Sequence, residues 1–249
     1  MKIESMKQID SGYRSSVQDW QSFLTCWEDR MLQDRSKETT PLKTPLIRLA
    51  RIETDEYARN VRALDATERR LNMKLPASYR HFAALTGGYW LVDSEGDQHL
   101  STEAPASHFL PVPEIGLFKD IDRVNWPIWD NNRVSRRASA DLYYRYDTFE
   151  RSTQDPSVFR DEQLDHLIKL GEFRGGAVVL LNPTEVTADG EYEAWFLAPY
   201  IAGAVRTRSF AELMQFLATR ELDDGKTIVT AFMKRNSCAG KLMTAAGSK

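Results

Sequence analysis

The sequence contains only two cysteines among its 249 residues, Cys26 and Cys238, and they lie near opposite ends of the chain. Neither belongs to a Cys-x-x-Cys pair, which is the spacing typical of thiolate metal sites and redox motifs. Two isolated cysteines fit a reducing compartment better than a disulfide scaffold. We therefore expect the protein to work in the cytoplasm.

Long apolar runs are also missing. The longest one extends from Ala194 to Val205 and is interrupted by Pro199 and Gly203, so it is too short to span a bilayer. The first five residues lack the apolar core of a signal peptide. We expect a soluble protein that has no membrane among its partners.

The chain has no marked excess of charge of either sign. Its net charge is -3, which gives no general reason to expect direct binding to nucleic acid or to anionic lipid. Hydrophobic residues make up 42% of the chain and charged residues 28%. This balance excludes wholesale disorder, and the chain is long enough to bury a hydrophobic core.

Motifs that would indicate catalysis are absent. No His-Glu-x-x-His motif, Gly-x-Ser-x-Gly motif or Walker loop occurs. The glycine-rich segment 171–176 precedes a predicted strand, whereas a phosphate loop must lead into a helix. We therefore expect no enzymatic activity, no metal and no cofactor. The histidines, none with a cysteine nearby, are His81, His99, His108 and His166.

Helical patterns dominate the first part of the chain. Apolar residues at spacings of three and four predict a helix over residues 17–31. Two closely spaced prolines predict a connection over 36–45, and helical signals resume at Thr54. Asp65 and Glu68 have the spacing of a capping box, which would mark a helix start.

The middle of the chain is less regular. Leu75–Pro76 begins a further predicted helix, and Gly87–Gly88 should end it because glycine readily adopts a positive φ. Residues 89–92 read as a short buried strand. Repeated prolines predict loops and short strands over 93–153, and Asp155–Pro156 then opens a predicted helix that ends at Gly171.

The last third has the clearest pattern. Apolar runs at 177–181 and 192–198 predict two strands, and Asp189–Gly190 predicts the tight turn between them. Residues 209–212 form a capping box in front of another helix, whereas the chain from Asp223 onward is weakly patterned. A hairpin among helices predicts an α+β fold with a mostly antiparallel, twisted sheet wrapped by helices.

The order of these landmarks resembles the SUKH superfamily, which is best known for bacterial immunity proteins and for a fungal regulator of cell-wall synthesis. The likeness extends over roughly residues 51–220, with Thr86 where family members often have asparagine. The residues that carry it are Glu68, Leu71, Leu75–Arg80, Phe82, Gly87–Gly88, Gly171–Glu172, Val178–Pro183, Gly190–Trp195 and Ser209–Phe210.

The resemblance implies a SUKH-like domain over 51–220 that has no enzymatic activity and, in most bacterial members, neutralises a cognate toxin by direct binding. The predicted N-terminal helix lies outside the likeness. We therefore expect three parts: an N-terminal helical extension over 1–50 that packs on the domain, the domain itself, and a partly flexible C-terminal extension over 221–249.

Charge is unevenly distributed. Residues 86–118 and 175–205 contain no lysine or arginine but many acids, while basic residues gather on the early helices. If the two segments are neighbours in one sheet, they form a negative surface that attracts a partner with a basic contact surface. The alternative is that these acids are merely solvated strand ends.

Two further groups have competing interpretations. Asp93, Glu95 and Asp97 lack the distal glutamate of a calcium loop, so we interpret them as an acidic turn or a contact with a basic partner. Trp126 and Trp129 suit either an interface or a core. The candidate partner-binding residues are Trp90, Asp93, Glu95, Asp97, Glu103, Trp126, Trp129, Asp130, Asp189, Glu191 and Glu193.

The leading hypothesis is a non-enzymatic immunity protein, expected as a monomer, that binds and neutralises a toxin. The alternative is an intracellular scaffold or regulatory adaptor with several protein partners. A third hypothesis, a hydrolase or nucleotide-binding enzyme, requires a pocket with convergent polar groups beneath His99 or His108.

Overall fold

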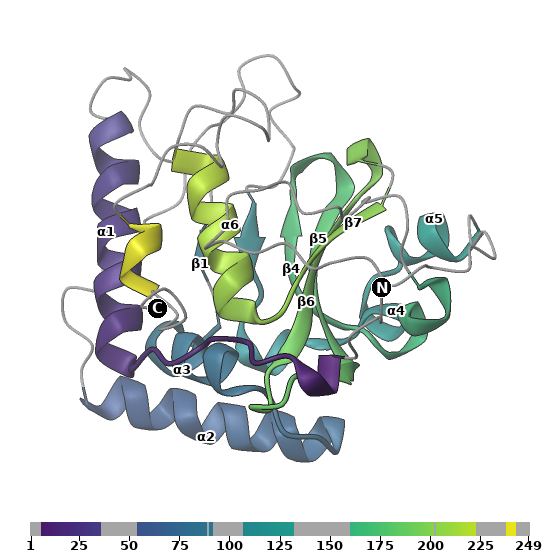
Figure 1. Ribbon diagram of the computed structural model, residues 1–249, viewed down its shortest axis with the longest axis horizontal. Coiled ribbons are helices and arrows are strands. Elements are labelled where there is room, and N and C mark those ends of the chain that lie inside the picture. The colour runs from purple at the N-terminus through teal and green to yellow at the C-terminus, as the bar shows by residue number, and fades with distance from the viewer. Residues whose placement is uncertain are drawn as a thin grey trace.

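A computed structural model describes residues 6–35, 54–88, 90–91, 107–131, 160–201, 203–222 and 238–242. Its centre is a seven-stranded sheet in the order β1-β2-β4-β5-β6-β7, with β3 pairing with β4 off this path. All pairings are antiparallel (Figure 1). The predicted α+β class and the antiparallel sheet are therefore confirmed.

The strands are β1 (Trp90–Leu91), β2 (His108–Phe109), β3 (Gly116–Leu117), β4 (Ile168–Phe173), β5 (Ala177–Val186), β6 (Tyr192–Ala198) and β7 (Gly203–Thr207). The α-helices are α1 (Val17–Arg35), α2 (Thr54–Leu71), α3 (Ala77–Thr86), α4 (Phe118–Ile121), α5 (Trp126–Asn131) and α6 (Phe210–Leu222). Short 3₁₀ turns are η1 (Met6–Gln8), η2 (Val112–Glu114), η3 (Asp161–His166), η4 (Arg174–Gly176), η5 (Pro199–Ile201) and η6 (Ala239–Leu242).

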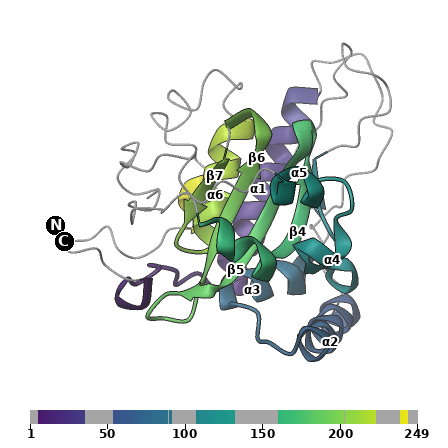
Figure 2. The same ribbon diagram turned by 90° about the vertical axis from the view of Figure 1, so that its right-hand side faces the viewer.

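Both faces of the sheet are covered. Helices α1, α3 and α6 share the main hydrophobic cluster on one face, where the Phe210 ring lies 5.8 Å from Trp20 and 5.2 Å from Phe82. Figure 2 looks onto the other face, with α4 and α5 in front of the strands. There a second cluster gathers Phe118, Trp195 and their neighbours.

The two clusters explain why strand β6 is apolar from Ala194 to Ala198. Successive side chains of a strand point to opposite faces. Ala194 and Phe196 accordingly belong to the main cluster, and Trp195 and Leu197 to the second. A strand buried on both sides reads as one continuous apolar run, which is why 192–198 was predictable.

Helix α3 ends as the sequence predicts. Gly87 and Gly88 have φ values of 67° and 87°, in the left-handed region that favours glycine. A Cβ atom on Gly88 would lie 2.7 Å from the carbonyl oxygen of Leu110, so there is no room for a side chain at this position. The Gly87 carbonyl then accepts a 2.8 Å hydrogen bond from the Val112 amide, which ties the helix end to η2.

The predicted helix from 155 to 171 is wrong. Residues 161–166 form a 3₁₀ turn, Ile168–Phe173 is strand β4, and 155–159 lie outside the described residues. Ile168 and Leu170 reach the main cluster while Lys169 lies between them, the alternation of a strand. Gly171 does not end a helix but lies within β4. Its lack of a Cβ atom lets the carbonyl oxygen of His108, on the neighbouring strand β2, approach closely.

The capping box at Asp65 and Glu68 is also wrong, because α2 already begins at Thr54 and both residues lie inside it. Amides in a helix interior are already hydrogen-bonded, so the motif has no donors to cap there. Of the predicted box at 209–212, the cap by Ser209 is confirmed: its hydroxyl accepts a 3.2 Å hydrogen bond from the Glu212 amide, whereas the Glu212 carboxylate accepts one from the Arg208 amide at 2.9 Å. The Glu212 carboxylate pairs with Arg208 at 2.6 Å.

The cysteines overturn an expectation. Cys26 on α1 and Cys238 before η6 form a disulfide, with their Cα atoms 5.5 Å apart. Leu242 is buried and its carbonyl oxygen accepts a hydrogen bond from Gln215 of α6, so η6 packs against both helices. Disulfides are rare in the cytosol, so cysteine usage no longer favours a reducing compartment.

Some expectations lie outside the described residues, namely the connection at 36–45 and most of 93–153 and 223–249. Strand β7 and helices α4 and α5 were not predicted. Pro127 was interpreted as a breaker, yet it is the second residue of α5, where proline is tolerated. Among the described residues, no helix is long and apolar enough to cross a membrane.

Candidate partner-binding surface

Exposed apolar side chains gather around α4 and α5. The described large hydrophobic residues that are exposed are Ile121 (39%), Val124 (74%), Ile128 (46%) and Tyr200 (50%). The first three lie within the short α4–turn–α5 segment, where Trp126 and Trp129 are half-buried. We call Ile121, Val124, Trp126, Ile128 and Trp129 the α4–α5 surface.

Tyr200 lies at the same end of the sheet. A Cβ atom on Gly175 would lie 3.2 Å from the Tyr200 ring, and one on Gly176 would lie 3.3 Å from the Asn125 side chain. Tyr200 and Asn125 therefore flank two consecutive glycines in the turn between β4 and β5. All four exposed large hydrophobics of the described residues thus lie in one region, which is unusual for side chains scattered by chance.

A buried ion pair holds the α4–α5 turn on the sheet. The Asp122 carboxylate accepts hydrogen bonds from the Asn125 amide at 2.7 Å and the Val124 amide at 3.1 Å. Its other oxygen lies 2.7 Å from the Lys169 ammonium on β4, and both side chains are almost fully buried. Lys169 also pairs with Glu172.

The charge state of Asp122 follows from these contacts. Burial alone would raise the pKa of this carboxyl, but the hydrogen bonds from Lys169 and Asn125 and the Lys169 charge outweigh it and lower the pKa below its usual value. Asp122 is therefore ionised at neutral pH. The turn that presents Val124 is fixed by a charged anchor rather than by apolar packing alone.

The two tryptophans, for which the sequence left an interface and a core both open, are partly buried against a core. Both pack against the second hydrophobic cluster, and the Trp126 ring meets Phe118 edge-on at 5.4 Å. Both also retain intermediate exposure. Half-buried aromatic residues with their base fixed in a core are the usual anchors of protein interfaces.

The predicted acidic residues do not form one cluster. Asp130 is exposed on α5, whereas Asp189 is exposed at the tip of the β5–β6 hairpin, where it binds Ser11. Strand β5 has ten residues and runs from the Asn125 end of the sheet to that tip. At 3.3 Å per residue, the strand places the hairpin tip with Asp189 about 30 Å from the Asn125 end of the sheet, where α5 and Asp130 lie. Asp130 and Asp189 therefore do not belong to one compact contact surface.

Glu191 and Glu193 are buried, with 2% and 1% of their surface exposed, so their assignment to an exposed acidic surface is wrong. Glu191 accepts hydrogen bonds from the Ser78 amide, at 2.9 Å, and from the Ser78 hydroxyl. Glu193 accepts one from Asn182 at 2.7 Å and lies 3.5 Å from the Arg206 guanidinium. Burial is the main cause that raises the pKa of both carboxyls, that of Glu191 to about 7.

Of the remaining candidates, Trp90 lies on strand β1, and its side chain is outside the described set. Asp93, Glu95, Asp97 and Glu103 also lie outside the described residues.

The three histidines that the structure describes do not converge. His81 hydrogen-bonds the Tyr13 hydroxyl at 2.8 Å, and burial lowers the pKa of His81, opposed by a hydrogen bond that its ring donates to the backbone of Ser15. His108 is on β2, His166 ends η3 and His99 is not described. Within the described part of the chain, no three His, Cys, Asp or Glu side chains are grouped so that they could hold a metal ion.

The aliphatic part of this surface was not predicted from the sequence. Ile121, Val124 and Ile128 are ordinary core residue types, and only the structure shows that they are exposed. One signal was available: three apolar residues flank two tryptophans within a segment that also contains Arg123, Pro127 and Asp130. Such a mixture is typical of a helical turn that is only partly buried.

The fold and its two-sided core define an α+β domain in which helices enclose an antiparallel sheet. A family model described as the SMI1 / KNR4 family (SUKH-1) matches residues 60–218. This match spans more than half of the chain, and the protein belongs to this family. Neither the comparison with curated proteins nor that with solved structures gives a match. Helix α1, η6 and the disulfide lie outside the matched residues.

Proposed function

We propose that this protein is a non-enzymatic immunity protein that binds a cognate bacterial toxin through the α4–α5 surface. Membership of the SUKH-1 family supports a role in protein binding. The observation that supports the location is the exposed aliphatic group of Ile121, Val124 and Ile128 around two half-buried tryptophans.

The physical basis is the usual composition of an interface. Aromatic anchors supply most of the binding free energy, and surrounding aliphatic contacts exclude water from them. Here the anchors are preorganised, because Asp122 and Lys169 fix the turn before any partner arrives. A preorganised surface loses little conformational entropy on binding, which favours a tight complex.

The toxin's contact surface is proposed to be apolar at its centre and basic at its rim. Asp120 and Asp130 are exposed beside the α4–α5 surface and supply negative charge there. Lys119 and Arg123 are exposed nearby as well and offset this charge, so apolar contacts rather than charge are expected to supply most of the affinity.

The test uses the toxin domain encoded by the neighbouring gene. Wild-type protein should restore growth of cells that express this domain and should form a one-to-one complex with it. The double variant Val124→Glu/Ile128→Glu should bind about 30-fold more weakly or worse, the effect of losing about 2 kcal/mol at an interface centre. Both side chains are exposed, so the variant should fold normally.

The matched control is Ser22→Glu/Ala188→Glu, which adds the same charge at exposed positions on α1 and on the β5–β6 hairpin. It should bind the toxin domain as wild type does. A toxin domain that is co-produced without associating, and that still kills the cell, contradicts the proposal. Several weak partners and no toxin would instead support a scaffold or adaptor.

A further inference from the structure

The outer side of helix α2 displays three arginines, Arg59, Arg62 and Arg69, all of them exposed. At 100° per residue these positions fall within an arc of about 80° around the helix axis, with the small residue Ala66 in the middle. They extend over about 15 Å along the helix, at 1.5 Å per residue. We call these three residues the arginine ridge.

The rotation of α2 is fixed by its inner side. Leu64 belongs to the main hydrophobic cluster. Asn60 donates a 3.1 Å hydrogen bond to the Ala84 carbonyl on α3, and Thr67 donates a 3.2 Å hydrogen bond to the Val112 carbonyl on η2. Since these contacts hold opposite ends of the buried side, the ridge points away from the domain.

Neighbouring basic residues have structural partners. Arg70 donates a 2.6 Å hydrogen bond to the Ile115 carbonyl. Arg80 pairs with Asp65 at 3.1 Å, and Lys74 pairs with Glu68 at 2.9 Å.

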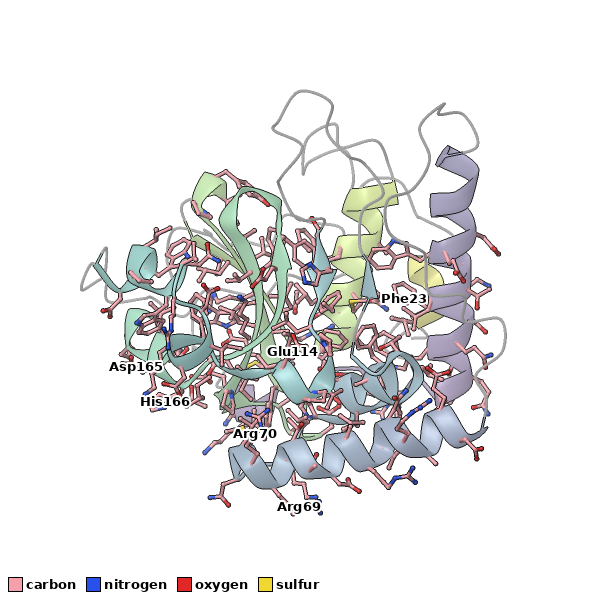
Figure 3. All side chains as sticks on the ribbon, turned by 180° about the vertical axis from the view of Figure 1, so that it is seen from behind. Phe23, Arg69, Arg70, Glu114, Asp165 and His166 are labelled. Carbon is pink, nitrogen blue, oxygen red and sulfur yellow. A yellow bond between two sulfur atoms is a disulfide. The ribbon has the colours of Figure 1, made fainter. Side chains whose placement is uncertain are left out.

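The ridge differs in this respect. No ion pair joins Arg59, Arg62 or Arg69 to any other residue that the structure describes. Figure 3 shows the contrast between neighbours: Arg69 points outward from α2, while Arg70 lies toward the body of the protein. The ridge is therefore available to a partner from outside.

Nearby acids offset the charge at only one end of the ridge. Asp65 is engaged by Arg80, and Glu68 is almost fully buried. The exposed acids Asp55 and Glu56 lie four and three residues before Arg59, so they reduce the positive charge around Arg59. The positive charge is therefore concentrated at Arg62 and Arg69, on a chain whose net charge is -3.

We propose that the arginine ridge is a second interaction surface, which binds an acidic segment of another protein. Guanidinium groups bind carboxylates in a planar, two-pronged geometry. Arg59 and Arg62 are one turn apart and Arg62 and Arg69 two turns apart, which fits a partner with carboxylates about 5 Å and 10 Å apart. A nucleic acid fits less well, because phosphate binding needs a larger basic surface than three arginines on an acidic chain.

This proposal stands independently of the proposed function. The ridge belongs to α2 and includes no residue of the α4–α5 surface. One molecule of this protein can therefore bind an acidic partner through α2 and, at the same time, a partner with a basic rim through the α4–α5 surface. Failure of either surface in its own experiment leaves the other surface intact.

The test is fluorescence anisotropy with a labelled helical peptide that has glutamate at every third or fourth position. A peptide with glutamine in those positions and an oligothymidine of equal charge serve as the comparison probes. The variant Arg59→Gln/Arg62→Gln/Arg69→Gln should bind the acidic peptide about 10-fold more weakly at low salt, since each exposed pair contributes up to about 1 kcal/mol. Wild-type binding should weaken as salt rises.

The charge-matched control is Lys119→Gln/Arg123→Gln/Lys241→Gln, which removes three exposed positive charges elsewhere. It should bind the acidic peptide within about 2-fold of wild type, because only the net charge has changed. Equal losses in the two variants, absence of binding to the acidic peptide, or tighter binding of the oligothymidine would each overturn the proposal. Thermal unfolding of both variants should match wild type, because all six side chains are exposed.

Discussion

The disulfide between Cys26 and Cys238 should be the strongest single stabiliser outside the hydrophobic core. It joins α1, near the start of the chain, to η6 near its end, with a sequence separation of 212 residues. We consider the double variant Cys26→Ser/Cys238→Ala, which removes the bond and keeps small side chains in both places.

The expected effect follows from the length of the loop that the bond closes. The entropy that a cross-link removes from the unfolded chain rises with the logarithm of loop length. For a separation of 212 residues it corresponds to about 5 kcal/mol at 25 °C. For a protein of this size, that lowers the midpoint of thermal unfolding by about 10–20 °C.

The assay is thermal unfolding followed by circular dichroism, with and without dithiothreitol. Wild type should unfold at a higher temperature than the double variant without reductant, and the two should converge with it. Mass spectrometry after rapid alkylation first establishes that the bond is present. If the bond is intact and the two midpoints still coincide, the entropic reasoning is refuted; free thiols in native protein would contradict the disulfide itself.

Two further predictions concern buried charges. Because burial raises the pKa of Glu191 to about 7, its protonated form is favoured in the fold, so its stabilising contribution is complete below about pH 4.5 and is lost as pH rises through 7. Relative to Glu191→Gln, wild type should lose about 3 kcal/mol of unfolding free energy over that range in urea denaturation; parallel pH profiles would contradict this. Asp122→Ala should destabilise the protein by about 3 kcal/mol, since it leaves the Lys169 ammonium buried with Glu172 alone. The companion change Lys169→Met in the same variant should recover part of that loss, and no recovery would show that the ion pair is not the cause.

Local pattern was sufficient where a segment is buried on one side or on both. The α1 periodicity and the β6 run each report burial directly, so both elements were predicted. Gly87–Gly88 was equally clear, because positive φ values at the end of a helix leave few choices of residue.

Pattern failed where the environment comes from distant residues. Leu164, Leu167 and Ile168 have helical spacing, yet Ile168 is buried by its antiparallel partner Leu181 on β5. No residue near Ile168 in sequence reveals that pairing. The local spacing favours the hydrogen bonds of a helix, whereas pairing with the apolar strand β5 favours those of a sheet. Here the pairing with β5 determines the structure.

Charge counting failed for a related reason. Glu193 looks like a solvated strand residue, but Asn182 lies opposite it on β5 and Arg206 approaches from β7, so the carboxylate is buried with partners. The pairing of Cys26 with Cys238 was equally invisible, because spacing along the chain says nothing about proximity across 212 residues.

Binding of a protein partner at the α4–α5 surface can be tested by hydrogen–deuterium exchange of the full chain, measured with and without the neighbouring toxin domain. Protection should be concentrated in residues 118–131, with little change at the β5–β6 hairpin tip. Tight binding that protects other segments and leaves 118–131 unchanged would contradict it.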